Sequence, residues 1–297
     1  MTFEQRDTLT GTALSWGCVP ELDLVDLAET AARHGFSEIA AQPGQFFRAR
    51  TDPGWRAKLE STGVRVGVVD ALMGYLPGAP VPARVPPSLR ESYSRSAEEC
   101  LEAAVELGAR TLNVAHFLGR TDVTVDEMVT AANALGVLAE KIGVRVCLEF
   151  IPGTGLPDLD TALRVVEGVD SPSVGVLFDT WHHIRSGGTP DEVTPAAAAR
   201  VIEVQISGWR PPAAAETYVP MTGRLAPGEG TAAVGDMVRR LRATSPHLVL
   251  GVEVFTSERG NPDARVARLA AATRAFLADL DIAPTKVVNG QFGNPNA

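Results

Sequence analysis

The sequence has few cysteines and no long apolar run. Its three cysteines, Cys18, Cys100 and Cys147, are odd in number and lack paired spacing, which argues against a disulfide framework and against a thiolate zinc site. No segment approaches the roughly 18 consecutive apolar residues of a membrane span. Residues 1–11 carry Glu4, Arg6 and Asp7 and lack the apolar core of a signal peptide. We therefore expect an unexported, cytoplasmic protein that does not bind membranes.

Excess positive charge is also missing. The formal net charge of the 297 residues is -9, and the arginines and lysines form no cluster. A protein that grips phosphate backbones needs such a cluster. The composition therefore argues against nucleic acid as a partner and leaves a small molecule as the expected ligand. It leaves homo-oligomerisation open.

Short apolar runs alternate with amphipathic stretches along the whole chain. The segment 24–34 is typical of the amphipathic stretches, because Leu24, Leu27, Ala28 and Ala31 fall on one helical face. The predicted strands are 12–18, 38–42, 64–71, 111–116, 145–150, 174–178, 201–207 and 248–255. Eight strand-helix units without a break in composition predict an α/β fold, a single (β/α)8 TIM barrel over residues 1–283. Residues 284–297, rich in Asn, Gly and Pro, are predicted to be a disordered tail.

The stretch 174–183, VGVLFDTWHH, indicates where ligands bind. Its apolar residues leave no polar face, as in a strand covered on both sides within a parallel sheet. Asp179 and His182 then follow at the carboxyl end of the strand. In a barrel this is the end that carries the active site.

Four successive predicted strands end in, or close to, a residue with an oxygen ligand: Glu149, Asp179, Gln205 and Glu253. Neighbouring strands lie about 4.8 Å apart, so the four side chains can converge on one divalent cation. Oxygen ligands favour Mn²⁺ or Mg²⁺, with Co²⁺ or Zn²⁺ as alternatives. The competing interpretation is that these carboxylates cap helices or pair with arginines, and that Gln205 bonds to a neighbouring backbone group.

The histidines near these strand ends are candidates for proton transfer and substrate binding. His182 lies beside the predicted metal site, and an imidazole titrates near working pH, so we assign it the proton-carrying role. His183 and His116 either orient the substrate or form hydrogen bonds within the surrounding shell. A structural role is the more common one for any single histidine.

Two further residues are candidate substrate contacts. Arg224, in GRLAPGEG, could clamp a carboxylate, a phosphate or a vicinal diol. Alternatively, the nearby Glu229 neutralises it within the loop. Trp181 could form an apolar wall of the pocket, although an aromatic residue at such a position is more often part of the core.

Taken in order, these motifs resemble the xylose isomerase-like TIM barrel family. The resemblance spans roughly residues 14–277 and depends on LEF at Glu149, FDTWH at Asp179 and His182, VQIS at Gln205, RLAPGEG at Arg224 and VEVF at Glu253. It implies a metal held by the residues at Glu149, Asp179, Gln205 and Glu253, with His182 contacting substrate or moving a proton.

Two positions separate the branches of that family. Ketose epimerases usually carry His where this chain has Gln205, whereas relatives of 3-dehydroshikimate dehydratase carry Gln. An acidic residue commonly follows the VQ segment, but Gly208 stands there, which puts one substrate contact in doubt. Endonuclease IV relatives bind three metal ions with many histidine ligands, and a sequence with only five histidines does not resemble them.

The resemblance implies a sugar (phosphate) or keto-polyol isomerase or epimerase that removes a proton α to a carbonyl. In that reaction Glu149 and Glu253 would exchange protons with the substrate. The first alternative is a dehydratase of a cyclic keto-polyol such as 3-dehydroshikimate or inosose, with His182 as the base. The second is a barrel without activity that only binds a small polar ligand.

Overall fold

Eight parallel strands close into one barrel. The computed structural model describes residues 9–211, 222–255 and 260–280, so the predicted tail at 284–297 lies outside the described residues. Each strand pairs with the next, and β8 pairs with β1 to close the ring. The strands are β1 Leu9–Ser15, β2 Phe36–Ala41, β3 Arg65–Leu72, β4 Thr111–Ala115, β5 Arg145–Glu149, β6 Val174–Asp179, β7 Val201–Ile206 and β8 Leu250–Val252. The predicted (β/α)8 barrel is confirmed.

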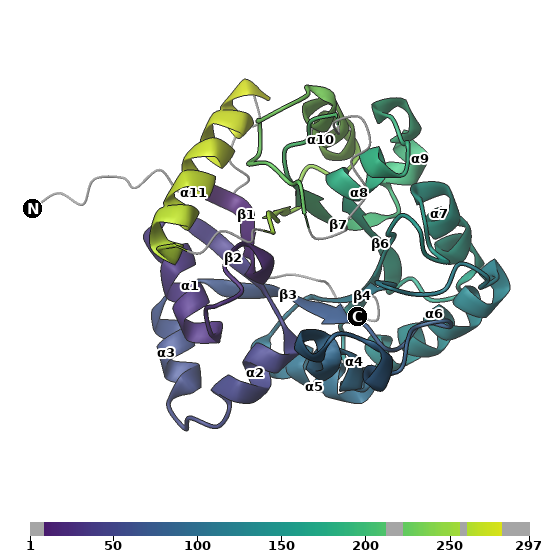
Figure 1. The fold of residues 1–297 in the computed structure, drawn as a ribbon, viewed down its shortest axis with the longest axis horizontal. Coiled ribbons are helices and arrows are strands. Elements are labelled where there is room, and N and C mark those ends of the chain that lie inside the picture. The colour runs from purple at the N-terminus through teal and green to yellow at the C-terminus, as the bar shows by residue number, and fades with distance from the viewer. Residues whose placement is uncertain (1–8, 212–221, 256–259, 281–297) are drawn as a thin grey trace, which may run out of the picture.

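Helices surround the strands as an outer ring (Figure 1). They are α1 Leu24–Arg33, α2 Pro43–Ala49, α3 Trp55–Ser61, α4 Arg90–Ser94, α5 Ala97–Leu107, α6 Val125–Glu140, α7 Leu159–Gly168, α8 Thr180–Arg185, α9 Pro195–Ala198, α10 Ala233–Thr244 and α11 Pro262–Asp279. Short 3-10 turns occur at Trp16–Cys18, Pro82–Arg84, Pro87–Leu89 and Pro190–Glu192. In α1 the predicted apolar face, which includes Leu24 and Leu27, is fully buried.

All eight strands differ by one or more residues from the predicted bounds, and the differences at β1 and β8 shape the carboxyl end of the barrel. β1 ends at Ser15 because the Ser15 hydroxyl accepts a hydrogen bond from the Gly17 amide at 3.2 Å and caps the turn Trp16–Cys18. β8 ends at Val252, although the Glu253 amide still donates to the Ile206 carbonyl at 3.1 Å. Glu253 therefore stands just beyond the last paired residue of its strand.

The barrel interior contains a layer of ion pairs below the carboxyl ends of the strands. Arg110, which precedes β4, pairs with Glu38 of β2 and with Glu203 of β7. Thr111 also donates to Glu203, at 2.6 Å. Residues two apart on a strand face the same side, which places Glu203 directly below Gln205. Ion pairs and a hydrogen bond thus connect distant strands across the lower half of the barrel.

None of the helices in the described ranges combines the length and the apolar character that crossing a membrane requires.

Candidate active site

The carboxyl ends of β5 to β8 bring the four predicted metal ligands to one end of the barrel. Glu149 is the last residue of β5, and Asp179 is the last residue of β6. Asp179 is paired in register with Gln205 of β7, and Glu253 follows β8. All four side chains are buried, none with more than 6% of its surface exposed. Buried carboxylates require compensation by hydrogen bonds or by cations.

Each of the three carboxylates has one oxygen bound by groups of the protein. Oδ1 of Asp179 accepts from the backbone amides of Trp181 at 2.7 Å and His182 at 3.4 Å, so Asp179 also caps α8. Oε2 of Glu149 accepts from the Asn113 amide at 2.7 Å. Oε1 of Glu253 accepts hydrogen bonds from two neighbours, the Ser15 hydroxyl and Nε2 of Gln205, both at 2.9 Å.

The second oxygens of these carboxylates face His182 and Arg224. Nε2 of His182 lies 3.4 Å from Oε1 of Glu149 and 3.5 Å from Oδ2 of Asp179. The Arg224 guanidinium lies 2.6 Å from Oδ2 of Asp179 and 3.3 Å from Oε2 of Glu253. It also lies 3.4 Å from Nε2 of His182. Oε1 of Glu149 and Oδ2 of Asp179 thus converge with Nε2 of His182 on one small region, and Arg224 links this region to Oε2 of Glu253.

The surroundings of these carboxylates shift their pKa values in opposite directions. Burial opposes ionisation of Asp179, but attraction to Arg224 and His182 outweighs it, and the pKa of Asp179 falls below its ordinary value. Burial dominates at Glu253, where it raises the pKa well above the usual range despite Arg224. The closer contact of Arg224 with Asp179 accounts for the difference. The site therefore holds both a firmly ionised carboxyl group and one that retains its proton readily.

The donor set fits a divalent cation. Oxygen and nitrogen atoms of Glu149, Asp179 and His182 lie within 4.8 Å of one another, so this triad could hold a metal ion. Oε1 of Gln205 is buried and has no hydrogen-bond partner among the described residues, while its Nε2 is used by Glu253. A buried carbonyl oxygen without a partner needs compensation, and a cation would supply it.

The predicted alternative for Arg224 is wrong. Glu229 does not neutralise it; Oε2 of Glu229 accepts from the Ala226 amide at 3.1 Å within its own loop. The guanidinium instead pairs with Asp179 and Glu253, and Trp181 packs against it, with its ring centroid 4.8 Å away. Nε and one terminal nitrogen of Arg224 have no partner within the described part of the chain, so donors remain for a ligand.

The structure does not bring His116 and His183 into this cluster. The His183 ring packs on Phe178, 4.9 Å between centroids, and its Nε2 lies 3.0 Å from the Thr189 carbonyl. Phe178 precedes Asp179 on β6 and faces the opposite side of the strand, so His183 lies between the barrel and its helices. His116 is fully buried against Gly119. For His183 the structure favours the structural interpretation, because its ring nitrogen contacts the Thr189 carbonyl; the role of His116 stays a prediction.

The sequence reasoning missed three residues that support the cluster from β1, β3 and β4. These are Ser15, Asp70 and Asn113, and Trp16, in the turn after β1, joins them; all four are buried. Asn113 donates from one amide nitrogen to both Asp70 and Glu149, each at 2.7 Å, and the Trp16 indole donates to Asp70 at 3.2 Å. Polar residues inside otherwise apolar strand segments, as in LNVA and VVDAL, were the available signal.

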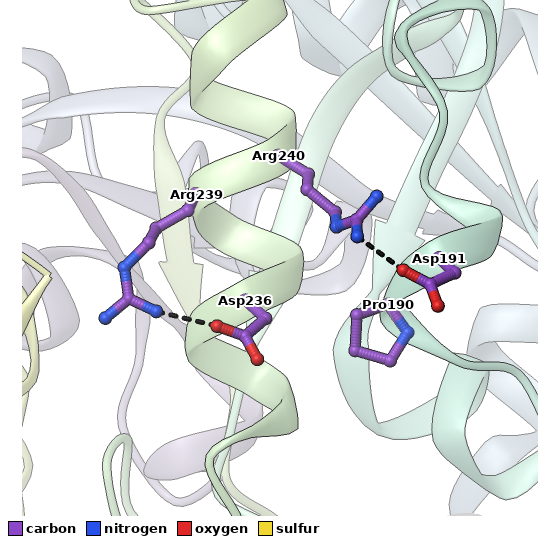
Figure 2. Close-up of a pocket in the computed structure, with 5 residues that line it drawn as sticks. All are labelled: Pro190, Asp191, Asp236, Arg239 and Arg240. Carbon is purple, nitrogen blue, oxygen red and sulfur yellow. Dashed lines mark hydrogen bonds and ion pairs between the residues drawn. The ribbon is translucent and has the colours of Figure 1, made fainter.

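A hollow on the outer surface, between α10 and the turn Pro190–Glu192, is lined by charged residues that are already paired. Arg239 binds Asp236, and Arg240 binds Asp191 (Figure 2). These contacts lie at the surface, where ion pairs contribute little.

Comparisons with known proteins agree with this fold. The model of the xylose isomerase-like TIM barrel family matches residues 28–278. The chain is 31% identical over 90 residues to inosose dehydratase of Lactiplantibacillus plantarum, a match that covers 30% of each protein. The solved structure of the IolI protein with a binding zinc atom superposes with a TM-score of 0.72 at 16% identity, over 91% of this chain and 97% of that one. D-psicose 3-epimerase of Clostridium cellulolyticum superposes with a TM-score of 0.65 at 14% identity, over 91% and 98%.

Proposed function

Because the chain belongs to the xylose isomerase-like TIM barrel family, we propose that it is a divalent-metal-dependent isomerase or epimerase. Its substrate is a small polar ketone, either a sugar, a sugar phosphate or a keto-polyol. The reaction begins with removal of a proton from the carbon α to the carbonyl group. The match to inosose dehydratase covers only 30% of that relative, so the activity is inferred from the site.

One observation carries this proposal. Glu149 and Asp179 each have one oxygen secured by the protein and a second oxygen within 4.8 Å of Nε2 of His182, and Arg224 links this group to Glu253, which is bonded to Gln205. Glu149, Asp179, Gln205 and Glu253 would hold the ion, with Mn²⁺ or Mg²⁺ preferred by such an oxygen-rich set. When bound, a divalent cation supplies Lewis-acid stabilisation to a developing enolate oxygen.

The residues of the chain itself would then move the proton and hold the substrate. Glu149 and Glu253 exchange protons with the substrate carbons, as carboxyl groups do in general acid-base catalysis. His182 contacts Glu149 and Asp179 and orients or protonates a substrate oxygen. The unused donors of Arg224, packed against Trp181, bind a hydroxyl or an anionic group of the substrate.

A dehydratase is the second candidate. Gln205, in place of the histidine usual in epimerases, and the partial match to inosose dehydratase favour it. The first step is the same, with His182 as the base, and a β-hydroxyl group then leaves as water. The two reactions diverge only after the enolate forms.

Proton NMR of candidate keto-sugars and keto-polyols in D₂O with Mn²⁺-loaded enzyme, quenched and freed of Mn²⁺ before recording, tests the proposal. An isomerase or epimerase incorporates deuterium at the α carbon without loss of water. New vinyl signals would instead identify a dehydratase. In either case we expect His182→Gln to lower the rate by about 10²-fold or more, as for loss of an acid-base group.

A barrel that only binds a ligand would behave differently. The purified protein would contain no divalent ion, and Glu149→Gln would leave every measured property unchanged. That result would overturn the proposed function.

A further inference from the structure

Asn113 occupies a position that hydrogen-bond geometry defines closely. It lies on β4, between Asp70 of β3 and Glu149 of β5, and it is fully buried. Its single amide nitrogen donates to Oδ1 of Asp70 and to Oε2 of Glu149, both at 2.7 Å. An amide group has two N–H donors, so these two carboxylates account for both of them.

This arrangement fixes the orientation of the amide group. A rotation of 180° would remove both donated hydrogen bonds and place the Asn113 carbonyl oxygen against Oε2 of Glu149, where oxygen atoms repel one another. Asp70 is held in turn, because its Oδ2 accepts from the Trp16 indole nitrogen at 3.2 Å. The hydrogen bonds therefore form one chain from Trp16 to Asp70, and from Asp70 through Asn113 to Glu149.

The end of this chain is the carboxylate of Glu149. With Oε2 held by Asn113, Oε1 is the oxygen that lies 3.4 Å from Nε2 of His182, in the triad with Asp179. A terminal carboxylate torsion is otherwise broad and poorly defined. Asn113 thus determines which oxygen of Glu149 faces the cluster. Asp70 in turn fixes the orientation of the Asn113 amide group.

We propose that Trp16, Asp70 and Asn113 are positioning residues that preorganise Glu149 for the metal ion. The inference rests on the proposed function, because it concerns the same ion. Partners that orient a ligand from behind typically raise metal affinity about 10–100-fold. The effect of each residue should decrease with the number of hydrogen bonds that separate it from Glu149, so that Asn113 contributes most and Trp16 least.

The test is a Mn²⁺ titration of the metal-free, full-length protein, which measures a dissociation constant independently of turnover. We expect Asn113→Leu, which removes both donors, to weaken Mn²⁺ binding about 10–100-fold. Asp70→Asn, which loses the acceptor for Trp16, should have a smaller effect. Trp16→Phe, which loses only the indole N–H, should have the smallest effect.

Thr111→Val serves as the matched control. Thr111 is on the same strand as Asn113 and is equally buried, but its hydroxyl binds Glu203 in the lower layer. Thr111→Val should lower the melting temperature and leave Mn²⁺ affinity within about twofold of wild type, because it acts on stability alone. If Asn113 contributed to stability alone, Asn113→Leu would likewise lower the melting temperature and leave Mn²⁺ affinity unchanged.

A double-mutant cycle identifies the route of the effect. If Asn113 acts through Glu149, Asn113→Leu should change Mn²⁺ affinity by less than about threefold in a Glu149→Gln background. Wild-type affinity in Asn113→Leu, or an undiminished loss in the Glu149→Gln background, would overturn the inference and leave the proposed function intact. A wild-type protein that binds no Mn²⁺ would overturn both.

Discussion

Arg224 is the residue whose position the sequence predicted least well. Its charge lies 2.6 Å from Oδ2 of Asp179, an oxygen that the proposed ion would also use. A guanidinium and a metal ion that share this oxygen would repel each other strongly in a buried site. The guanidinium and the metal ion therefore compete for the same carboxylates, and binding of the ion should move Arg224 toward the substrate.

We expect Arg224→Met to raise Mn²⁺ affinity about tenfold or more, since a repulsion of roughly 1.4 kcal/mol suffices for that factor. Methionine keeps the apolar stem that packs near Trp181. The measurement is a Mn²⁺ titration of the metal-free protein, with Arg120→Met as the control at an exposed pair with Asp122. Weaker binding in Arg224→Met would show that Arg224 supports the ion.

Asp70 should make the stability of the metal-free protein depend on pH. Burial and the nearby charge of Glu149 raise the pKa of Asp70 from 3.8 to about 7. Between these values the unfolded chain loses this proton while the folded protein keeps it, so stability falls as pH rises. Above pH 7 this contribution levels off.

Denaturant unfolding of wild type and Asp70→Asn from pH 4 to pH 8, in the presence of a chelator, measures this dependence. The stability of wild type relative to the variant should decrease with rising pH up to about 7. A difference that is constant over this range would contradict the assignment.

At the scale of strands and helices, the residues at the carboxyl ends of strands could be predicted from the sequence, whereas the residues behind them could not. The apolar run before Asp179 and the short runs around Glu149 identify β5 and β6 without ambiguity, and their carboxyl ends must carry ligands. Asp70 and Asn113 escaped prediction because their role depends on which strands are neighbours and in what register. Arg224 was a candidate substrate contact, but its ion pairs with Asp179 and Glu253 could not be predicted because its loop conformation depends on contacts with distant strands. Local patterns thus predict elements, while long-range pairing determines the contacts behind the site.

The lower layer of the barrel should be a main source of stability. Arg110 binds Glu203 with two nitrogens, at 2.9 and 3.0 Å, and also binds Glu38. Without Arg110, Glu38 would keep its pair with Arg65, but the buried Glu203 would lose its cation; breaking a buried pair in this way costs about 3–5 kcal/mol. We expect Arg110→Leu to lower the free energy of unfolding by this amount, as measured by denaturant titration.

Arg239→Leu is the control for that measurement. Its pair with Asp236 is half exposed on α10 (Figure 2), and an exposed pair contributes less than about 1 kcal/mol. Equal losses in the two variants would mean that the lower layer has no special role.

For the whole molecule, the proposed ion should act as a stabilising ligand. Binding to the folded state alone adds about 2.7 kcal/mol to the free energy of unfolding at an ion concentration of 100 times the dissociation constant. The melting temperature should therefore rise with Mn²⁺ and return to its initial value with a chelator. Asp179→Ala should abolish the rise; an equal rise in that variant would locate the ion elsewhere.

The ligands and the groups that orient them come from different halves of the chain. Glu149, Asp179, Gln205 and Glu253 belong to β5 and the strands after it, whereas Ser15, Trp16, Asp70 and Asn113 belong to β1, the turn after β1, β3 and β4. The two halves meet at the seams between β4 and β5 and between β8 and β1. Two fragments divided in the turn after α6 would each bind Mn²⁺ poorly, and mixing them would restore tight binding only once both seams had formed. Ion affinity would then serve as a gauge of ring closure.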